Sequence, residues 1–152
     1  MFIMPAKGRI TSPFGMRNHP ISKNRLMHWG IDVGNHADNV IEAAAAGKVR
    51  LVVTNNPKNG YGHYLIITHK NGWETLYAHL ASVSVRTGVQ VKQGERIGVK
   101  GTTGASTGIH LHFEIHNGRW NNRWSYAVNP LSYISDAAVK QTQLLLVSVG
   151  YK

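Results

Sequence analysis

Residues 110–116 read His110-Leu111-His112-Phe113-Glu114-Ile115-His116, a strict alternation of polar and apolar side chains. Successive side chains of a β-strand point to opposite faces, so this alternation predicts a strand. Its apolar face can pack into a core, while its other face carries three histidines and a glutamate. That polar face is unusual for solubility alone, although an amphipathic edge strand whose histidines face water would show the same pattern.

Short strands between turns are predicted along most of the chain. β-Branched residues gather at 29–34, 47–54 and 62–69, and further strands are expected at 73–78, 95–99 and 111–117. Asn71-Gly72 is a hairpin signal between two of these strands. Only residues 38–46 and the stretch after Ser135 are compatible with a helix. The expected fold class is therefore mainly β, a single antiparallel β-sheet domain.

The composition limits the class of protein. A chain of 152 residues with 42% apolar and 16% charged residues suits one folded domain spanning 1–152 and excludes a disordered chain. No apolar stretch approaches the roughly 18 residues that a membrane-spanning helix needs. The net charge of +10 predicts attraction to polyanions such as nucleic acid or an acidic cell wall.

The chain has nine histidines and no cysteine. Disulfides and thiolate metal sites are therefore excluded, and any metal must be held by histidine, aspartate or glutamate.

A second alternating segment, residues 28–34, offers two candidate ligands. His28, Gly30 and Asp32 would share one face of a strand. Positions four apart in a straight strand are about 13 Å apart, too far to meet easily at one metal. Gly30 permits a bend that brings His28 toward Asp32 and leaves room for an ion. The alternative is an unrelated histidine and aspartate at a turn.

Together the two segments supply His28, Asp32 and one or both of His110 and His112. Three protein ligands and a water are typical of a catalytic zinc site, which keeps one coordination position open. No His-Glu-x-x-His helix is present, so the helical zinc-protease arrangement is excluded.

The chain resembles the lysostaphin-type (LytM-like) zinc metallo-endopeptidases of bacterial cell walls from about residue 8 to residue 134. The residues that carry the resemblance occur in the family's order: Ser12-Pro13-Phe14-Gly15-Met16-Arg17, His28-x3-Asp32, Tyr77-Ala78-His79-Leu80, residues 104–114 and Asn129-Pro130-Leu131. Each motif is weak alone, whereas the ordered set is highly specific. The resemblance implies a lysostaphin-type catalytic fold with a groove, and leaves 135–152 as a C-terminal extension of unknown role.

The resemblance also implies roles for particular residues. His28, Asp32 and His112 correspond to the ligands of one zinc ion per chain, and His79 and His110 to the catalytic pair beside it. His19 stands where some relatives place a tyrosine that assists the transition state. Trp29, Tyr61, Tyr77 and Trp120 are candidate walls of a substrate groove. The other histidines, His36, His63, His69 and His116, are expected to be structural or solvent-facing, with His69 the best candidate to support the zinc site.

The expected activity is zinc-dependent hydrolysis of peptidoglycan peptide cross-links, with D-alanyl–diaminopimelate bonds favoured by the Arg-x-His-Pro motif at 17–20. Expected partners are peptide stems and anionic wall polymers, with no nucleic acid and no membrane span. The protein would act in the bacterial wall, the periplasm or outside the cell. Residues 1–5 lack the features of a signal peptide, which favours a phage-borne lysin, a tail hydrolase or an excised domain.

Two alternatives belong to other classes of protein. One is a catalytically inactive family member that binds wall peptide or activates another hydrolase. The other is a basic nucleic-acid-binding β domain, for which no aromatic-and-basic signature is present. Residues 119–126 look like an insertion relative to the family and are expected either to shape specificity or to contact glycan.

Overall fold

The computed structural model describes residues 1–18, 25–55, 58, 60–106 and 108–134, which form strands and the turns between them. The strands are β1 (Arg9–Ser12), β2 (Gly15–Asn18), β3 (Arg25–His28), β4 (Ile31–Gly34), β5 (Val40–Glu42), β6 (Gly47–Val53), β7 (Tyr64–Thr68), β8 (Glu74–Ala78), β9 (Leu80–Val83), β10 (Gln90–Val91), β11 (Arg96–Lys100), β12 (His110–His116) and β13 (Ala127–Val128). Two 3-10 turns, η1 (Lys70–Gly72) and η2 (Pro130–Ser132), complete the described elements.

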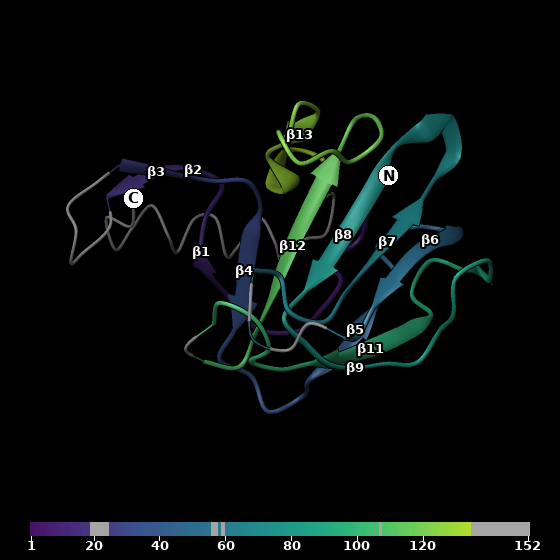
Figure 1. The fold of residues 1–152 in the computed structure, drawn as a ribbon, viewed down its shortest axis with the longest axis horizontal. Coiled ribbons are helices and arrows are strands. Elements are labelled where there is room, and N and C mark those ends of the chain that lie inside the picture. The colour runs from purple at the N-terminus through teal and green to yellow at the C-terminus, as the bar shows by residue number, and fades with distance from the viewer. Residues whose placement is uncertain (19–24, 56–57, 59, 107, 135–152) are drawn as a thin grey trace.

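The largest sheet runs in the order β1-β4-β12-β8-β7-β6-β10, and β13 pairs with the C-terminal end of β12. All of its strand pairs are antiparallel. β12 lies between β4 and β8 in the middle of this sheet (Figure 1). The expected strand at 111–117 is confirmed, and the edge-strand alternative is wrong.

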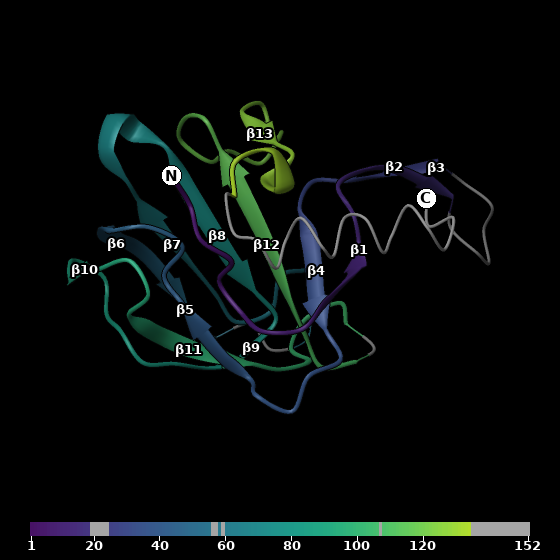
Figure 2. The same ribbon diagram turned by 180° about the vertical axis from the view of Figure 1, so that it is seen from behind.

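A three-stranded sheet, ordered β5-β11-β9, and the apolar face of the large sheet enclose the core (Figure 2). Leu111, Phe113 and Ile115 are fully buried in it, together with Ile41 of β5 and Ile97 of β11. The period-two pattern of β12 therefore fills the core with one face and leaves the other to carry the polar groups.

The six expected strands are all present, with ends that differ from the expected ones by at most two residues. The hairpin at Asn71-Gly72 is also confirmed, because it joins the antiparallel strands β7 and β8. Both residues have positive φ, 65° and 79°, a conformation that asparagine and glycine tolerate best.

The helix considered for residues 38–46 is not formed. Val40–Glu42 is instead β5, which pairs with β11. The central side chain, Ile41, is fully buried in the core, so tertiary pairing decides the conformation of this short segment.

No helix among the described residues has the length and apolarity to cross a membrane. The other expected helical region, after Ser135, lies outside the described residues.

Candidate metal centre

Three predicted ligands, His28, Asp32 and His112, converge on one point. Each offers one ligand atom, and these atoms all lie within 4.8 Å of one another. His28 Nε2 is 3.2 Å from His112 Nδ1 and 3.3 Å from Asp32 Oδ1, and His112 Nδ1 is 3.0 Å from the same oxygen. Two imidazole nitrogens and a carboxylate oxygen form a donor set that suits zinc.

Strand register and one bend bring these side chains together. Asp32 and His112 are directly opposite each other in the antiparallel pair β4–β12. His28 is the last residue of β3, and the chain bends at Gly30 before β4 begins, as expected. A Cβ on Gly30 would lie 2.3 Å from the Phe113 carbonyl oxygen and 3.0 Å from the His112 ring, so glycine is required for the close approach of the strands.

The second ring nitrogen of each histidine ligand is held by an acceptor. His28 Nδ1 lies 2.8 Å from the Pro13 carbonyl oxygen, and His112 Nε2 lies 2.8 Å from Glu114 Oε2. A proton on each of these nitrogens leaves a lone pair on the nitrogen that faces the centre. The sequence alone left His110 and His112 as alternative ligands. The structure favours His112, because its Nδ1 lies 3.0 Å from Asp32 Oδ1, whereas His110 Nε2 lies 3.7 Å from that oxygen.

Glu114 supports the centre, a role that was not predicted from the sequence. Its carboxylate is almost fully buried and accepts hydrogen bonds from His112, from His116 Nε2 at 2.7 Å and from the Tyr61 hydroxyl at 2.6 Å. Burial alone would raise the pKa of Glu114, but the hydrogen bonds from both histidines lower it to about 2. The alternation of polar and apolar residues in 110–116 places Glu114 on the same face as His112. This alternation is the feature of the sequence that could have indicated its role.

The negative charge of Asp32 and the positive charge of His112 stabilise each other. Burial opposes ionisation of Asp32, yet hydrogen bonds with His112 and His28 hold the pKa of Asp32 well below its usual range. Burial likewise opposes protonation of His112, but its hydrogen bonds with Asp32 and Glu114 raise the pKa to about 9. A proton on His112 Nδ1 therefore occupies the place that a metal would take.

His79 and His110 lie beside the three ligands, with ring centroids 4.9 Å apart. His79 Nδ1 donates to the Thr103 carbonyl oxygen at 2.7 Å, and His110 Nδ1 to the Gly108 carbonyl oxygen at 2.8 Å. In each ring Nδ1 is engaged, so Nε2 is the nitrogen available to a group bound in the site. The Nε2 atom of His110 lies 3.7 Å from Asp32 Oδ1. Burial lowers the pKa of His79 to about 4, so its ring is neutral at pH 7.

The backbone of His79 also has an uncommon conformation. Its φ is 64°, a left-handed value that a non-glycine residue adopts at some cost. This turn follows the last residue of β8 and precedes β9, where the chain changes sheets.

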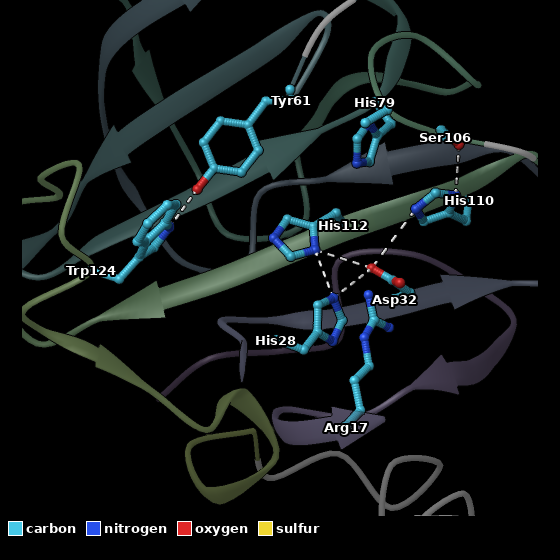
Figure 3. Close-up of a pocket in the computed structure, with 11 residues that line it drawn as sticks. Arg17, His28, Asp32, Tyr61, His79, Ser106, His110, His112 and Trp124 are labelled. Atoms are coloured by element: carbon cyan, nitrogen blue, oxygen red, sulfur yellow. Dashed lines mark hydrogen bonds and ion pairs between the residues drawn. The ribbon is translucent and has the colours of Figure 1, made fainter. Parts of the chain in front are cut away.

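All five side chains border one open cavity of about 630 Å³ (Figure 3). The residues that line it are Arg17, His28, Asp32, Gly60, Tyr61, His79, Ala105, Ser106, His110, His112 and Trp124. This cavity is the groove that the resemblance implied.

Two loops form one wall of this cavity and pack closely against each other. A Cβ on Gly104, whose φ is 77°, would lie 2.4 Å from the Gly60 carbonyl oxygen and from the Gly62 nitrogen. Glycine at position 104 is therefore required by loop packing. The neighbouring Ala105 and Ser106 face the cavity.

Of the aromatic residues proposed as groove walls, Tyr61 lines the cavity, whereas Tyr77 is fully buried in the core. The Tyr61 hydroxyl accepts from Trp124 Nε1 at 2.7 Å while it donates to Glu114. Burial and the charge of Glu114 raise the pKa of Tyr61, so the hydroxyl keeps its proton. Trp124, from the insertion at 119–126, stacks on Trp29 with centroids 5.7 Å apart and was missed as a cavity residue.

The remaining predicted histidines lie in different environments. His36 is exposed, and His116 is fully buried against Glu114. His69 makes its hydrogen bonds with the Ala46 carbonyl oxygen and Thr75 and contacts none of the three ligands, so the expectation that it supports the centre is wrong. His19 lies outside the described residues.

Comparison with known proteins agrees with this geometry. The sequence profile described as Peptidase family M23 matches residues 26–129. The "DD-carboxypeptidase/endopeptidase Mpg" of Neisseria meningitidis is 44% identical over 125 residues, which cover 82% of this chain and 26% of that protein. The chain thus spans about a quarter of the length of this relative.

Solved structures share the fold. A zinc-containing peptidase from Vibrio cholerae aligns with a TM-score of 0.67 at 34% identity, over 75% of this chain and 36% of that one. The catalytic domain of lysostaphin from Staphylococcus simulans aligns with a TM-score of 0.67 at 28% identity, over 87% of this chain and 93% of that one.

Proposed function

This chain belongs to peptidase family M23, and we propose that it is a zinc-dependent endopeptidase that hydrolyses peptide cross-links of bacterial peptidoglycan. The observation that carries the proposal is the convergence of His28, Asp32 and His112 in an open cavity beside the Nε2 atoms of His79 and His110. The lysostaphin-type fold of the neighbouring structures supports it.

The donor set fits a catalytic zinc ion held by His28, Asp32 and His112. Two neutral imidazoles and one carboxylate would leave the site with a net charge near +1, and the open cavity leaves space for water and substrate. When bound, zinc supplies polarisation of the scissile carbonyl and acidification of an attacking water.

His79 acts as the proton acceptor in this proposal. Its ring is neutral at pH 7, and its Nδ1 is engaged by Thr103, so the Nε2 lone pair is free to take a proton from the attacking water.

His110 acts as the proton donor to the leaving amine. Its Nδ1 is engaged by the Gly108 carbonyl oxygen, and its Nε2 lies 3.7 Å from Asp32 Oδ1 at the edge of the centre, where it can pass a proton to the leaving amine. The two ring centroids are 4.9 Å apart, so both histidines can reach the same reacting group.

The substrate is proposed to be the peptide stem, cut between D-alanine and diaminopimelate. Support comes from the name of the relative in Neisseria meningitidis, which describes a DD-carboxypeptidase and endopeptidase. A site of action in the bacterial wall follows from this substrate. The net charge of +10 would help to retain the protein on anionic wall polymers, and this retention should weaken as salt rises.

A catalytically inactive role in wall binding is the alternative, but the full set of ligands and both histidines disfavours it. The test is digestion of purified cross-linked peptidoglycan by the zinc-loaded protein, followed by mass spectrometry of the released fragments. New peptide termini that a chelator suppresses and added zinc restores are expected, and their masses identify the bond. Intact cross-links with zinc demonstrably bound would refute the proposal and favour the alternative.

A further inference from the structure

We infer that Arg17 binds a free carboxylate on the leaving-group side of the scissile bond, so that the protein selects peptides whose released amine is attached to a carboxylate-bearing carbon. This inference rests on the proposed function and names the substrate feature that the same site recognises.

Arg17 belongs to the cavity by position. It lies on β2, which pairs with β3, the strand that ends at His28. Its side chain lines the same cavity as His28 and Asp32, and it points toward the metal centre in the close-up view (Figure 3).

The guanidinium group of Arg17 contacts the protein on one side and is exposed on the other. One terminal nitrogen donates to Ser12 Oγ, and Ser12 Oγ also lies 3.3 Å from His28 Nδ1. Among the described residues, Arg17 has no ion pair with an acidic side chain and no other hydrogen bond. A guanidinium group carries five donors, so most of them remain for a ligand.

The cavity offers this cation no permanent carboxylate partner. Asp32 is the one acidic side chain among the residues described as lining it, and its oxygen is directed to the metal centre. With zinc bound beside Arg17, an incoming anion would meet two positive groups. A planar guanidinium group recognises a carboxylate through paired hydrogen bonds, which a single ammonium group cannot reproduce.

Substrate geometry identifies which carboxylate would reach Arg17. In a D-alanyl–diaminopimelate cross-link, the leaving nitrogen is attached to a carbon that carries a free carboxylate. This carboxylate is three bonds from the reacting carbonyl carbon, short enough for both to lie in one cavity of about 630 Å³. In a glycine bridge the corresponding carboxyl is an amide and carries no charge, so Arg17 would favour the diaminopimelate substrate.

The test compares two cross-linked peptide dimers that differ in one group. One has the free carboxylate next to the leaving nitrogen, and the other has a carboxamide there. The zinc-loaded wild type is expected to hydrolyse the carboxylate dimer with a kcat/KM about 10- to 100-fold higher. Arg17→Gln should bring that ratio close to one through loss of activity on the carboxylate dimer, and Arg17→Lys should give an intermediate ratio.

Arg86→Gln is the matched control, because Arg86 is exposed and does not line the cavity, and the variant loses the same charge. It should retain the wild-type ratio. An equal loss on both dimers in Arg17→Gln would overturn the inference, since Arg17 would then act on a group common to both substrates. A wild type that cleaves both dimers equally would also overturn it and leave the proposed function standing, whereas a wild type that cleaves neither would refute the proposed function.

Discussion

His112 Nε2 lies 2.8 Å from Glu114 Oε2, two residues further along the same strand, and this contact directs His112 Nδ1 to the metal centre. Glu114 accepts two further hydrogen bonds, from His116 and Tyr61, so one buried carboxylate organises three side chains. The orientation of a ligand therefore depends on residues that do not touch the metal themselves.

Glu114→Gln should weaken zinc binding by about 10- to 100-fold, because a neutral amide with one acceptor oxygen cannot satisfy three donors. Competition with a chromogenic chelator measures the affinity. Glu95→Gln, at an exposed position, should bind zinc as the wild type does. Unchanged affinity in Glu114→Gln would show that Glu114 does not orient His112.

Tyr61→Phe should lower the free energy of unfolding by about 1–3 kcal/mol, because the buried Glu114 carboxylate loses a donor and Trp124 Nε1 loses its acceptor. Urea unfolding of the zinc-loaded protein provides the measurement. Tyr126→Phe removes a hydroxyl from a residue that is 49% exposed and should change stability little. Equal effects of the two substitutions would contradict the role given to Tyr61.

His79→Ala should retain zinc but lose about 10²- to 10⁴-fold in turnover of peptidoglycan peptides, the usual contribution of one general acid–base group. Zinc content is measured by atomic absorption on the same sample used for the kinetics. His36→Ala, at an exposed site away from the cavity, is the control. Full turnover by His79→Ala would show that His79 is not required for catalysis.

The imidazole of His79 should titrate with a midpoint of about 4, and not near 6.5 as an exposed histidine does. Burial causes this shift, so the unfolded chain binds a proton that the folded chain does not. His79 therefore reduces folding stability as the pH falls from about 6.5 toward 4. NMR of the histidine ring resonances measures the midpoint directly, and a value between 6 and 7 would contradict the burial argument.

Glu74→Gln should destabilise the protein by about 2–4 kcal/mol at pH 7, because Arg50 would keep its charge without its partner. Both oxygens of Glu74 pair with Arg50, at 2.6 and 2.8 Å, and Thr68 and the Trp120 backbone also donate to them. Burial alone would raise the pKa of Glu74, but these hydrogen bonds hold it below its usual value.

The stabilising effect of Glu74 depends on pH in a defined direction. A carboxyl whose pKa is lowered by folding stabilises the protein above the pKa of the unfolded chain, about 4.3, and loses this effect at lower pH. The difference between wild type and Glu74→Gln in urea unfolding should therefore shrink from pH 6 to pH 3. A difference that does not change with pH would argue against an ionised Glu74.

The sequence by itself predicted the fold class and the five histidine and aspartate residues found at the candidate site. Alternation in 110–116 is a local property of the chain, because strand geometry converts it directly into two faces. The ordered motifs likewise indicated His28, Asp32, His79, His110 and His112, all of which line one cavity. The helix considered at 38–46 is not formed, because a segment of this length takes its conformation from its neighbours in the sheet.

Only the tertiary structure decided how these residues face one another. Asp32 and His112 are 80 positions apart in the chain and meet through the register of β4 and β12. The acceptors that hold each ring nitrogen, the contact between Tyr61 and Trp124, and the position of Arg17 depend on strands and loops that are distant in sequence. Local periodicity encodes which face a side chain takes, but the pairing of distant strands determines which side chains share that face.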